Sequence, residues 1–525
     1  MSKTIHSAGA RLALGCLIAA ISYGAALAGD GFSPCADAAL PGLEGSLCAT
    51  SEMPLRPDDP DAGMVELFIR KIPSISGRTT GQVWLIAGGP GESGASFYPF
   101  LDTFRAAFPD RDLMIPDHRG TGYSTRLCPA EEASDSPGGH ALERAEWGSC
   151  IGGMYADLDR TRSFTITNAS HDLSALITRY RSEGSLRVYG VSYGTQLVLR
   201  MLQTAPVALD AIVLDGLVPL EAAAEFDLSH RTAVVDKVGR SLLSADQIEA
   251  YEALLGDPDR QALWAEVAPS GDLRRFLAAL LNFPGLRDQI PAVISGLSRG
   301  DASRLAAVRT SLETEFDQLG RYPQSSPALP LVVLMNASEN NGRRDLTTEA
   351  VEAEARGALF TSPLPGLLVG ASAPLYDRDG YYGRSPAALP RTLVIHGTLD
   401  PNTPYEGAVA HAAKLAEAGE VAFATVVSGA HMLPFAAPEC FVRMVSAFDA
   451  AAEVPSSCDS RLRRLPERLH ARRTCEVSLL AFGAARTGRR PNRREAGPEP
   501  YGANSLNQSA PPARPAGPLQ QMPQR

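Results

Sequence analysis

The chain has 525 residues, of which 44% are hydrophobic and 21% charged, and its formal net charge is −10. This length and apolar content exclude a single small module and a disordered chain, and eight cysteines are too few for a scaffold built mainly on disulfides. The acidic balance argues against nucleic acid as a partner.

Residues 1–28 have the pattern of an export signal. Lys3 and Arg11 precede a short apolar stretch at 12–21, and Ala26-Leu27-Ala28 is a candidate cleavage site. No charged cluster follows the stretch, which favours cleavage over a membrane anchor. Cys16 lies in a weak lipoprotein-like box, so lipid anchoring there is the alternative. We therefore expect an exported chain, periplasmic or secreted, with no membrane span in its mature form.

Short strands alternate with helices through much of the body. We expect helices at 170–180 and 195–203, and strands at 83–86, 113–116, 187–190, 211–214, 392–395 and 421–427. Such alternation predicts an α/β fold with a mostly parallel sheet flanked by helices.

The alternation stops between residues 219 and 389. This stretch is rich in Ala, Leu and Arg, and helical periodicity is clear at 248–255 and 273–281. We therefore expect a mostly helical cap at 219–389, inserted between two parts of the core at 29–218 and 390–460.

The last segment, 461–525, differs from the body in composition. It contains thirteen Arg, no Lys, four Glu and nine Pro, so it carries +9 while residues 1–460 carry −19. With only short apolar runs it cannot bury enough surface to offset chain entropy, and we expect disorder. A dispensable extension is the simplest interpretation; contact with anionic envelope surfaces is the alternative.

The cysteines left after signal removal are expected to pair in an oxidising compartment. Their spacing in the sequence suggests three local pairs, while Cys475 is odd and lies in the basic segment. The suggested pairs are Cys35–Cys48, Cys128–Cys150 and Cys440–Cys458.

The strongest chemical signal is Gly190-Val191-Ser192-Tyr193-Gly194, a G-x-S-x-G pattern with a strand before it and a helix after it. Glycines two residues to either side of the serine allow a sharp turn that projects its hydroxyl over the strand ends. Ser192 is therefore the candidate nucleophile.

A serine nucleophile needs a histidine base oriented by a carboxylate, and with such a turn the order along the chain is Ser, acid, His. His431 directly follows the strand at 421–427, and Asp400 follows the strand at 392–395, so we expect these two side chains to complete a triad. His396 is more readily explained as a core residue, and Asp215 as a structural carboxylate, although Asp215 is the rival acid.

Acyl transfer also needs hydrogen-bond donors for the developing oxyanion. The backbone amides of Gly89, in the glycine-rich loop at 88–91, and of Tyr193 are placed to supply them. No H-E-x-x-H or C-x-x-C pattern occurs, so we expect neither a metal nor an organic cofactor.

Four motifs in order resemble one family over residues 60–455. They are Gly88-Gly89-Pro90-Gly91-Glu92-Ser93-Gly94, Asp117-His118-Arg119-Gly120-Thr121-Gly122-Tyr123-Ser124, the Ser192 motif, and Gly397-Thr398-Leu399-Asp400-Pro401-Asn402-Thr403-Pro404. The chain resembles the aminopeptidases of the α/β-hydrolase fold, namely prolyl iminopeptidases and, more closely, secreted bacterial tripeptidyl-aminopeptidase-like enzymes. The resemblance implies a serine exopeptidase that acts on peptides with a free N-terminus under a helical cap.

Three further expectations come from this resemblance. Ala87 stands where prolyl iminopeptidases usually have His, which weakens the case for strict proline specificity. Glu339 corresponds to an acidic cap residue of relatives and is the candidate ligand for a substrate ammonium. Arg119 is expected to brace the oxyanion loop through backbone carbonyls.

Two other functions remain open at this stage. An esterase or lipase-like hydrolase would use the same triad on small acyl esters. A hydrolase-fold protein kept for binding alone is the second, and the complete set of Ser, Asp and His argues against it.

Overall fold

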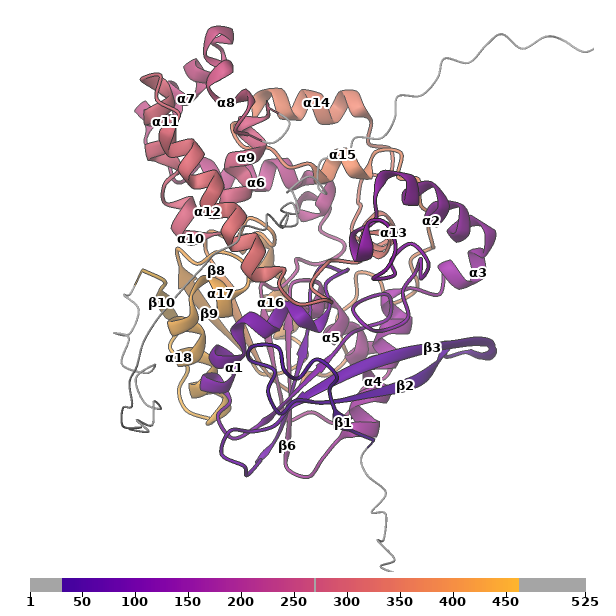
Figure 1. The fold of residues 1–525 in the computed structure, drawn as a ribbon. Helices are drawn as coiled ribbons and strands as arrows, with labels where there is room; N and C mark the ends of the chain where they lie inside the picture. The colour runs from indigo at the N-terminus through magenta and orange to yellow at the C-terminus, as the bar shows by residue number, and fades with distance from the viewer. Residues whose placement is uncertain (1–30, 269–270, 462–525) are drawn as a thin grey trace, which may run out of the picture.

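The computed structural model describes residues 31–268 and 271–461, which are coloured in Figure 1. The predicted export signal, with Cys16, and the basic segment from residue 462 onward lie outside the described residues, so what we expect of them stays a prediction. Within the described residues, no helix has the length and apolar content needed to cross a membrane.

A ten-stranded sheet forms the centre of the protein. The strands in spatial order are β1 (Ser33–Pro34), β2 (Leu47–Arg56), β3 (Asp59–Ile72), β5 (Asp112–Pro116), β4 (Gly81–Ile86), β6 (Ser185–Val191), β7 (Ala211–Asp215), β8 (Arg391–Gly397), β9 (Val421–Val427) and β10 (Ser457–Asp459). Pairs from β1 through β3 to β5 are antiparallel, and all pairs from β5 across to β10 are parallel. The predicted mostly parallel sheet is confirmed.

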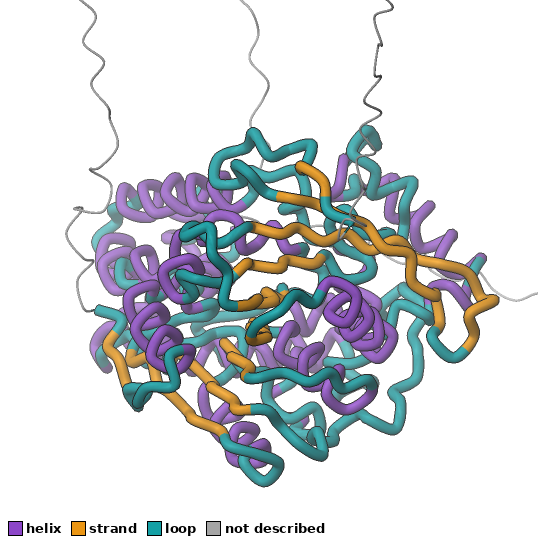
Figure 2. Tube along the Cα trace, turned by 90° about the horizontal axis from the view of Figure 1, so that it is seen from below, coloured by secondary structure: helices purple, strands orange, loops and turns teal. Residues whose placement is uncertain are grey.

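Helices cover both faces of this sheet, as Figure 2 shows from below. The helices outside the segment between β7 and β8 are α1 (Leu101–Ala107), α2 (Arg144–Ala156), α3 (Leu158–Thr161), α4 (Ile166–Tyr180), α5 (Tyr193–Thr204), α16 (Tyr405–Leu415), α17 (Leu433–Ala436) and α18 (Pro438–Asp449). Of these, α4, α5, α16, α17 and α18 contact strands directly. Leu173 of α4 and Leu197 of α5 belong to one buried cluster, and Phe104 of α1 and Phe441 of α18 belong to another. Because both faces are covered, every residue of β4, β5 and β7 is buried.

The long β2–β3 hairpin was missed in the sequence. From Ala49 to Leu55 its first strand alternates between buried and more accessible residues, which is the pattern of a strand covered on one face. That period of two was the signal that could have found it.

The segment between β7 and β8 is helical and leaves the sheet entirely. Its helices are α6 (Arg231–Arg240), α7 (Ala245–Leu255), α8 (Ala262–Ala265), α9 (Leu273–Leu280), α10 (Pro284–Arg287), α11 (Ile290–Ser298), α12 (Ser303–Leu319), α13 (Leu329–Ser338), α14 (Thr348–Gly357) and α15 (Leu364–Leu368). β7 and β8 are nevertheless direct neighbours in the sheet. In Figure 1 these helices gather above the sheet, and Tyr251, Phe276 and Ile294 belong to a hydrophobic cluster of their own.

The three predicted disulfides are present. Cys35 is bonded to Cys48, Cys128 to Cys150, and Cys440 to Cys458. The last of these joins α18 to the edge strand β10. Each closes a loop of about 13 to 22 residues, so each restricts the unfolded chain locally.

Candidate active site

Ser192 occupies a strained turn between β6 and α5. Its backbone has φ +55° and ψ −126°, a conformation rarely adopted by residues other than glycine. A Cβ atom on Gly190 would lie 2.7 Å from the carbonyl oxygen of Gly194, and one on Gly194 would lie 2.3 Å from that of Ile86. Both glycines are therefore required by close backbone contacts, which explains the G-x-S-x-G pattern.

The turn places the Ser192 hydroxyl at the carboxyl end of the sheet. The backbone N–H of Ser192 donates to the carbonyl of Asp215 at the end of β7 (3.0 Å). Tyr193 is the first residue of α5, where amide groups have no partner within the helix and the helix dipole is positive. This end of the sheet therefore presents a hydroxyl next to an amide available to an anion.

Asp400 and His431 form the acid–base pair predicted from the sequence. Asp400 Oδ2 lies 2.7 Å from His431 Nδ1, and the two residues stand in the loops after β8 and β9. Asp400 also accepts hydrogen bonds from the amides of Asn402 and Thr403 and from the Thr403 hydroxyl. Burial opposes its charge, but the positive charge of His431 and the hydrogen bond from its ring hold the pKa of Asp400 well below its ordinary value.

The His431 ring is oriented by this contact. Burial lowers the pKa of His431, but the carboxylate of Asp400 raises it more, so the pKa lies above its ordinary value. With Nδ1 directed at Asp400, Nε2 faces away from the carboxylate and is free to serve as the base.

His431 and Ser192 share the same end of the sheet but are not bonded. The ring lies against Gly216, where a Cβ would be 2.9 Å from His431 Cε1. Gly216 directly follows Asp215, whose carbonyl accepts a hydrogen bond from the Ser192 amide. Among the described residues, no hydrogen bond joins the Ser192 hydroxyl to the ring. Such contacts are commonly long without substrate and shorten in the loaded enzyme.

The two rival residues have structural roles. His396 is completely buried in β8, and its Nε2 lies 2.8 Å from the carbonyl of Thr403. Asp215 Oδ2 accepts hydrogen bonds from the Tyr189 hydroxyl (2.7 Å) and the Leu433 amide (2.9 Å). Asp215 thus ties the chain just beyond His431 to the sheet, which agrees with its interpretation as a structural carboxylate.

The glycine-rich loop after β4 approaches the nucleophile closely. A Cβ on Gly88 would lie 3.0 Å from Ser192 Cβ, so this loop lies beside the nucleophile turn, and the role of the Gly89 amide as an oxyanion donor stays a prediction. The base of this loop is held by Asp117, whose Oδ1 accepts from the Gly94 amide (2.7 Å). Sequence reasoning did not assign that role to Asp117.

Arg119 does not brace the oxyanion loop, so that expectation was wrong. It donates to carbonyls, as predicted, but to those of Leu55 and Ser163, and it pairs with Asp172. Arg119 therefore ties the β2–β3 hairpin to the start of α4. The sequence shows a basic residue in a motif but not which carbonyls face it.

The cap contacts every loop of the site. The Arg231 side chain donates to Asn402 Oδ1 (2.8 Å) in the Asp400 loop, and the Arg287 side chain donates to the Ser428 carbonyl (2.9 Å) in the His431 loop. The amide of Ala328 donates to the Gly91 carbonyl in the oxyanion loop (2.9 Å). These cap residues carry no local sequence signal, because only the folded insertion brings them to the site.

Glu339 follows α13 and is only 5% exposed. It lies beside Tyr376, one carboxylate oxygen has no hydrogen-bond partner among the described residues, and burial raises the pKa of Glu339 to about 7. Its charge also contributes to the raised pKa of Tyr193, the residue after the nucleophile, for which burial is the main cause. Glu339 is thus near the site but enclosed, and its binding of a substrate ammonium stays a prediction.

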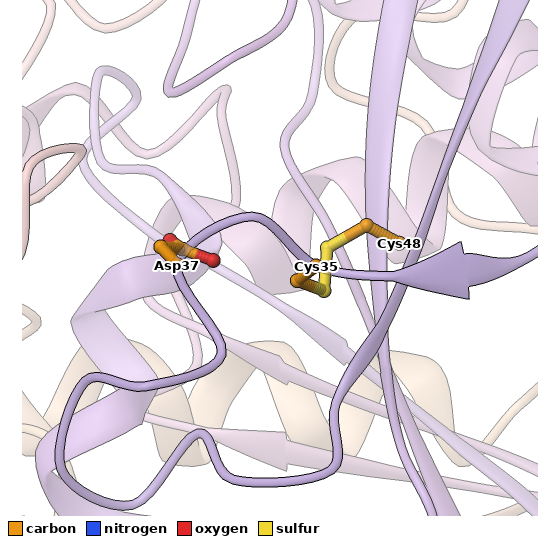
Figure 3. Close-up of side chains that lie close together, drawn as sticks. All are labelled: Cys35, Asp37 and Cys48. Atoms are coloured by element: carbon orange, nitrogen blue, oxygen red, sulfur yellow. A yellow bond between two sulfur atoms is a disulfide. The ribbon is translucent and has the colours of Figure 1, made fainter.

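Cys35, Asp37 and Cys48 are a cluster with the composition of a metal site, but they do not form one. Figure 3 shows the two sulfur atoms bonded to each other, so neither is available as a thiolate. Asp37 pairs with Arg70 through two contacts of 2.7 Å. The cluster is therefore a structural disulfide beside an ion pair.

Comparison with known proteins agrees with this fold. A family model for the alpha/beta hydrolase fold matches residues 83–438. The chain belongs to the α/β-hydrolase family. As a member of it, the protein is classed as a hydrolase, while the family model does not distinguish a peptidase from other hydrolases. No curated protein matches the sequence.

Several solved structures are similar to this α/β hydrolase at low sequence identity. A thermophilic esterase from Thermogutta terrifontis is 14% identical, covers 74% of this chain and 95% of its own length, and has a TM-score of 0.33. VinJ is 14% identical, with 77% and 99% covered and a TM-score of 0.35. The Aspergillus niger epoxide hydrolase is 13% identical, with 78% and 80% covered and a TM-score of 0.32.

Proposed function

We propose that this α/β hydrolase is a serine hydrolase that forms an acyl-enzyme on Ser192, and that its substrates are peptides with a free N-terminus. The observation that carries the proposal is the 2.7 Å contact of Asp400 with His431 on the same sheet end as the strained Ser192 turn. Those three side chains are the parts that acyl transfer needs.

In the first half-reaction His431 Nε2 takes the hydroxyl proton as Ser192 Oγ bonds to the scissile carbonyl carbon. The amides of Gly89 and Tyr193 stabilise the negative charge that develops on the carbonyl oxygen, each contributing about 10²- to 10³-fold to the rate. The carbon–nitrogen bond then breaks, and His431 gives its proton to the leaving amine.

In the second half-reaction a water molecule replaces the leaving amine. His431 takes its proton, the oxygen attacks the acyl carbon, and the bond to Ser192 Oγ breaks as the serine regains a proton. Throughout, Asp400 keeps the ring in one tautomer and stabilises its positive charge. It can do so because its carboxylate contacts Nδ1 and, with a lowered pKa, stays ionised.

The peptide assignment is supported by the four sequence motifs shared with aminopeptidases and by the carboxylates near the site. Ester hydrolysis is the second candidate, because the same three side chains attack esters through the same steps and an esterase is among the solved structures of this fold. In either case the acyl-enzyme on Ser192 is the common intermediate.

Turnover of matched substrates separates the candidates. We would measure kcat/KM for alanine p-nitroanilide and for alanine methyl ester, using wild type and Ser192→Ala. An aminopeptidase cleaves both, whereas an esterase cleaves only the ester, and Ser192→Ala should lose at least about 10³-fold of either activity. Equal activity of Ser192→Ala and wild type would contradict the proposal.

A further inference from the structure

Glu92 is an exposed residue between two buried neighbours in the oxyanion loop. Gly91 and Ser93 are buried under the cap, where the Gly91 carbonyl accepts from the Ala328 amide and the Ser93 hydroxyl donates to the Gln324 carbonyl (2.6 Å). Since the cap covers both neighbours, the accessible surface of Glu92 must face open space beside the loop.

That open space adjoins the nucleophile. The point where Gly88 would carry a Cβ lies 3.0 Å from Ser192 Cβ and 3.7 Å from Glu92 Oε2. Glu92 Oε2 and Ser192 Cβ are therefore no farther apart than the sum of those two distances, and the nucleophilic Oγ is one bond from that Cβ. A group held by Glu92 would lie next to the carbonyl that Ser192 attacks.

The Glu92 carboxylate has no partner in the described part of the chain. It forms neither an ion pair within 4.0 Å nor a side-chain hydrogen bond there, in contrast to Asp400 and Asp117, which each accept several hydrogen bonds. Part of the Glu92 surface is accessible, but protein encloses the carboxyl group, and this burial raises the pKa of Glu92 while the nearby His431 charge opposes the rise.

An unpaired carboxylate at this place affects catalysis. The transition state places negative charge on the carbonyl oxygen, and a second negative charge nearby raises the barrier. A substrate with a positive charge between the two removes the penalty and gains a charge-assisted hydrogen bond. The site should therefore favour cationic acyl groups over neutral ones.

We propose that Glu92 binds the α-ammonium of the residue whose carbonyl Ser192 attacks, so that the enzyme releases one N-terminal residue at a time. In an amino acid the α-nitrogen lies about 2.5 Å from the carbonyl carbon, which lets one residue reach both groups. The inference rests on the proposed acyl-enzyme at Ser192 but holds for an amine or an alcohol leaving group.

Glu339 is the competing carboxylate, and the two differ in accessibility. Glu339 is 5% exposed and enclosed beside Tyr376, while Glu92 is exposed beside Ser192. The surface of Glu92 is accessible, whereas that of Glu339 is not. We therefore assign the ammonium of the first residue to Glu92 rather than to Glu339.

The test compares substrates with and without the positive charge. We would measure kcat/KM for alanine and N-acetylalanine derivatives, as p-nitroanilides and as methyl esters, in wild type and in Glu92→Gln, Glu92→Asp and Glu339→Gln. The exposed Glu44→Gln serves as the matched control. In Glu92→Gln the free-amine substrate should lose about 10- to 100-fold while the acetylated one is unchanged or faster. Glu92→Asp should recover part of the preference.

Two results would overturn the assignment. Equal losses on both substrates in Glu92→Gln would show a structural role, and loss of the preference in Glu339→Gln alone would place the ammonium there. Labelling with an uncharged fluorophosphonate, at least as fast in Glu92→Gln as in wild type, checks that the variant is folded. Failure of the proposed function looks different, because wild type would then turn over none of these substrates.

Discussion

The ends of β7 and β8 hold two buried carboxylates whose pKa values are shifted in opposite directions. Asp215 and Asp400 are each 1% exposed, their strands are neighbours, and both act on the charge of His431. Burial raises the pKa of Asp215 to about 7, whereas that of Asp400 lies well below its ordinary value despite the same burial.

Hydrogen-bond donors account for the difference. Asp400 accepts from an imidazole, a hydroxyl and two amides. Asp215 accepts from one hydroxyl and one amide, and its Oδ1 has no partner among the described residues. Donors and a neighbouring positive charge, rather than burial itself, therefore decide which carboxylate has the lower pKa and serves the base.

Replacing Asp400 should have the largest effect. In Asp400→Asn the ring loses its negative partner, so the reactive tautomer and the imidazolium are both less stable, and we expect kcat to fall by about 10³- to 10⁴-fold. Steady-state kinetics with circular dichroism as a folding check would measure this. A loss of less than tenfold would mean that another carboxylate supports His431.

Removing one donor should have a smaller effect. Thr403→Val deletes the hydroxyl bonded to Asp400, so we expect the free energy of unfolding to fall by about 1–3 kcal/mol and kcat by less than about tenfold. Urea titration and kinetics measure the two. Thr403→Ser keeps the hydroxyl and should behave like wild type; if it does not, the methyl group is what matters.

Asp215→Asn should change the pH profile more than the maximal rate. Asp215 has no hydrogen bond to His431, but its negative charge raises the pKa of the ring. Without that charge His431 becomes neutral at lower pH, so the acid limb of kcat/KM should move downward while kcat changes only a few-fold. A kcat loss as large as that of Asp400→Asn would make Asp215 a partner of the base.

The same variant should alter how stability depends on pH. The folded pKa of Asp215 is about 7, above the unfolded value of about 3.9, so its contribution is complete below about pH 4 and is lost as pH rises through 7. Between pH 4 and 7, wild type should therefore lose about 1–4 kcal/mol of unfolding free energy that Asp215→Asn retains. Asp61→Asn, at an exposed position, should show the wild-type slope in urea titrations.

Much of the parallel half of the fold could be predicted from the sequence. β4, β6 and β8 are short apolar runs stopped by turns, and burial on both faces makes such runs continuous. The antiparallel β2 was missed although its period of two is a local signal, and the edge strand β10 has only three residues and pairs with the distant β9.

In the site, too, the features with a local sequence signal could be predicted and those that depend on distant contacts could not. The glycines at 190 and 194 made the role of Ser192 predictable, because close local backbone contacts leave no room for a Cβ at either position. The contacts of Arg231 and Arg287 with the catalytic loops could not be foreseen, since each joins residues more than 140 positions apart. Glu92 was read only as part of a motif, because its accessibility follows from how the cap covers its neighbours.

The most direct test of the account is the identity of the nucleophile. Folded wild type would be treated with a fluorophosphonate and the modified peptide located by mass spectrometry. We predict a single adduct on Ser192, absent in Ser192→Ala and much slower to form in His431→Ala. No adduct, or one on another serine with Ser192→Ala still labelled, would contradict the proposed enzyme.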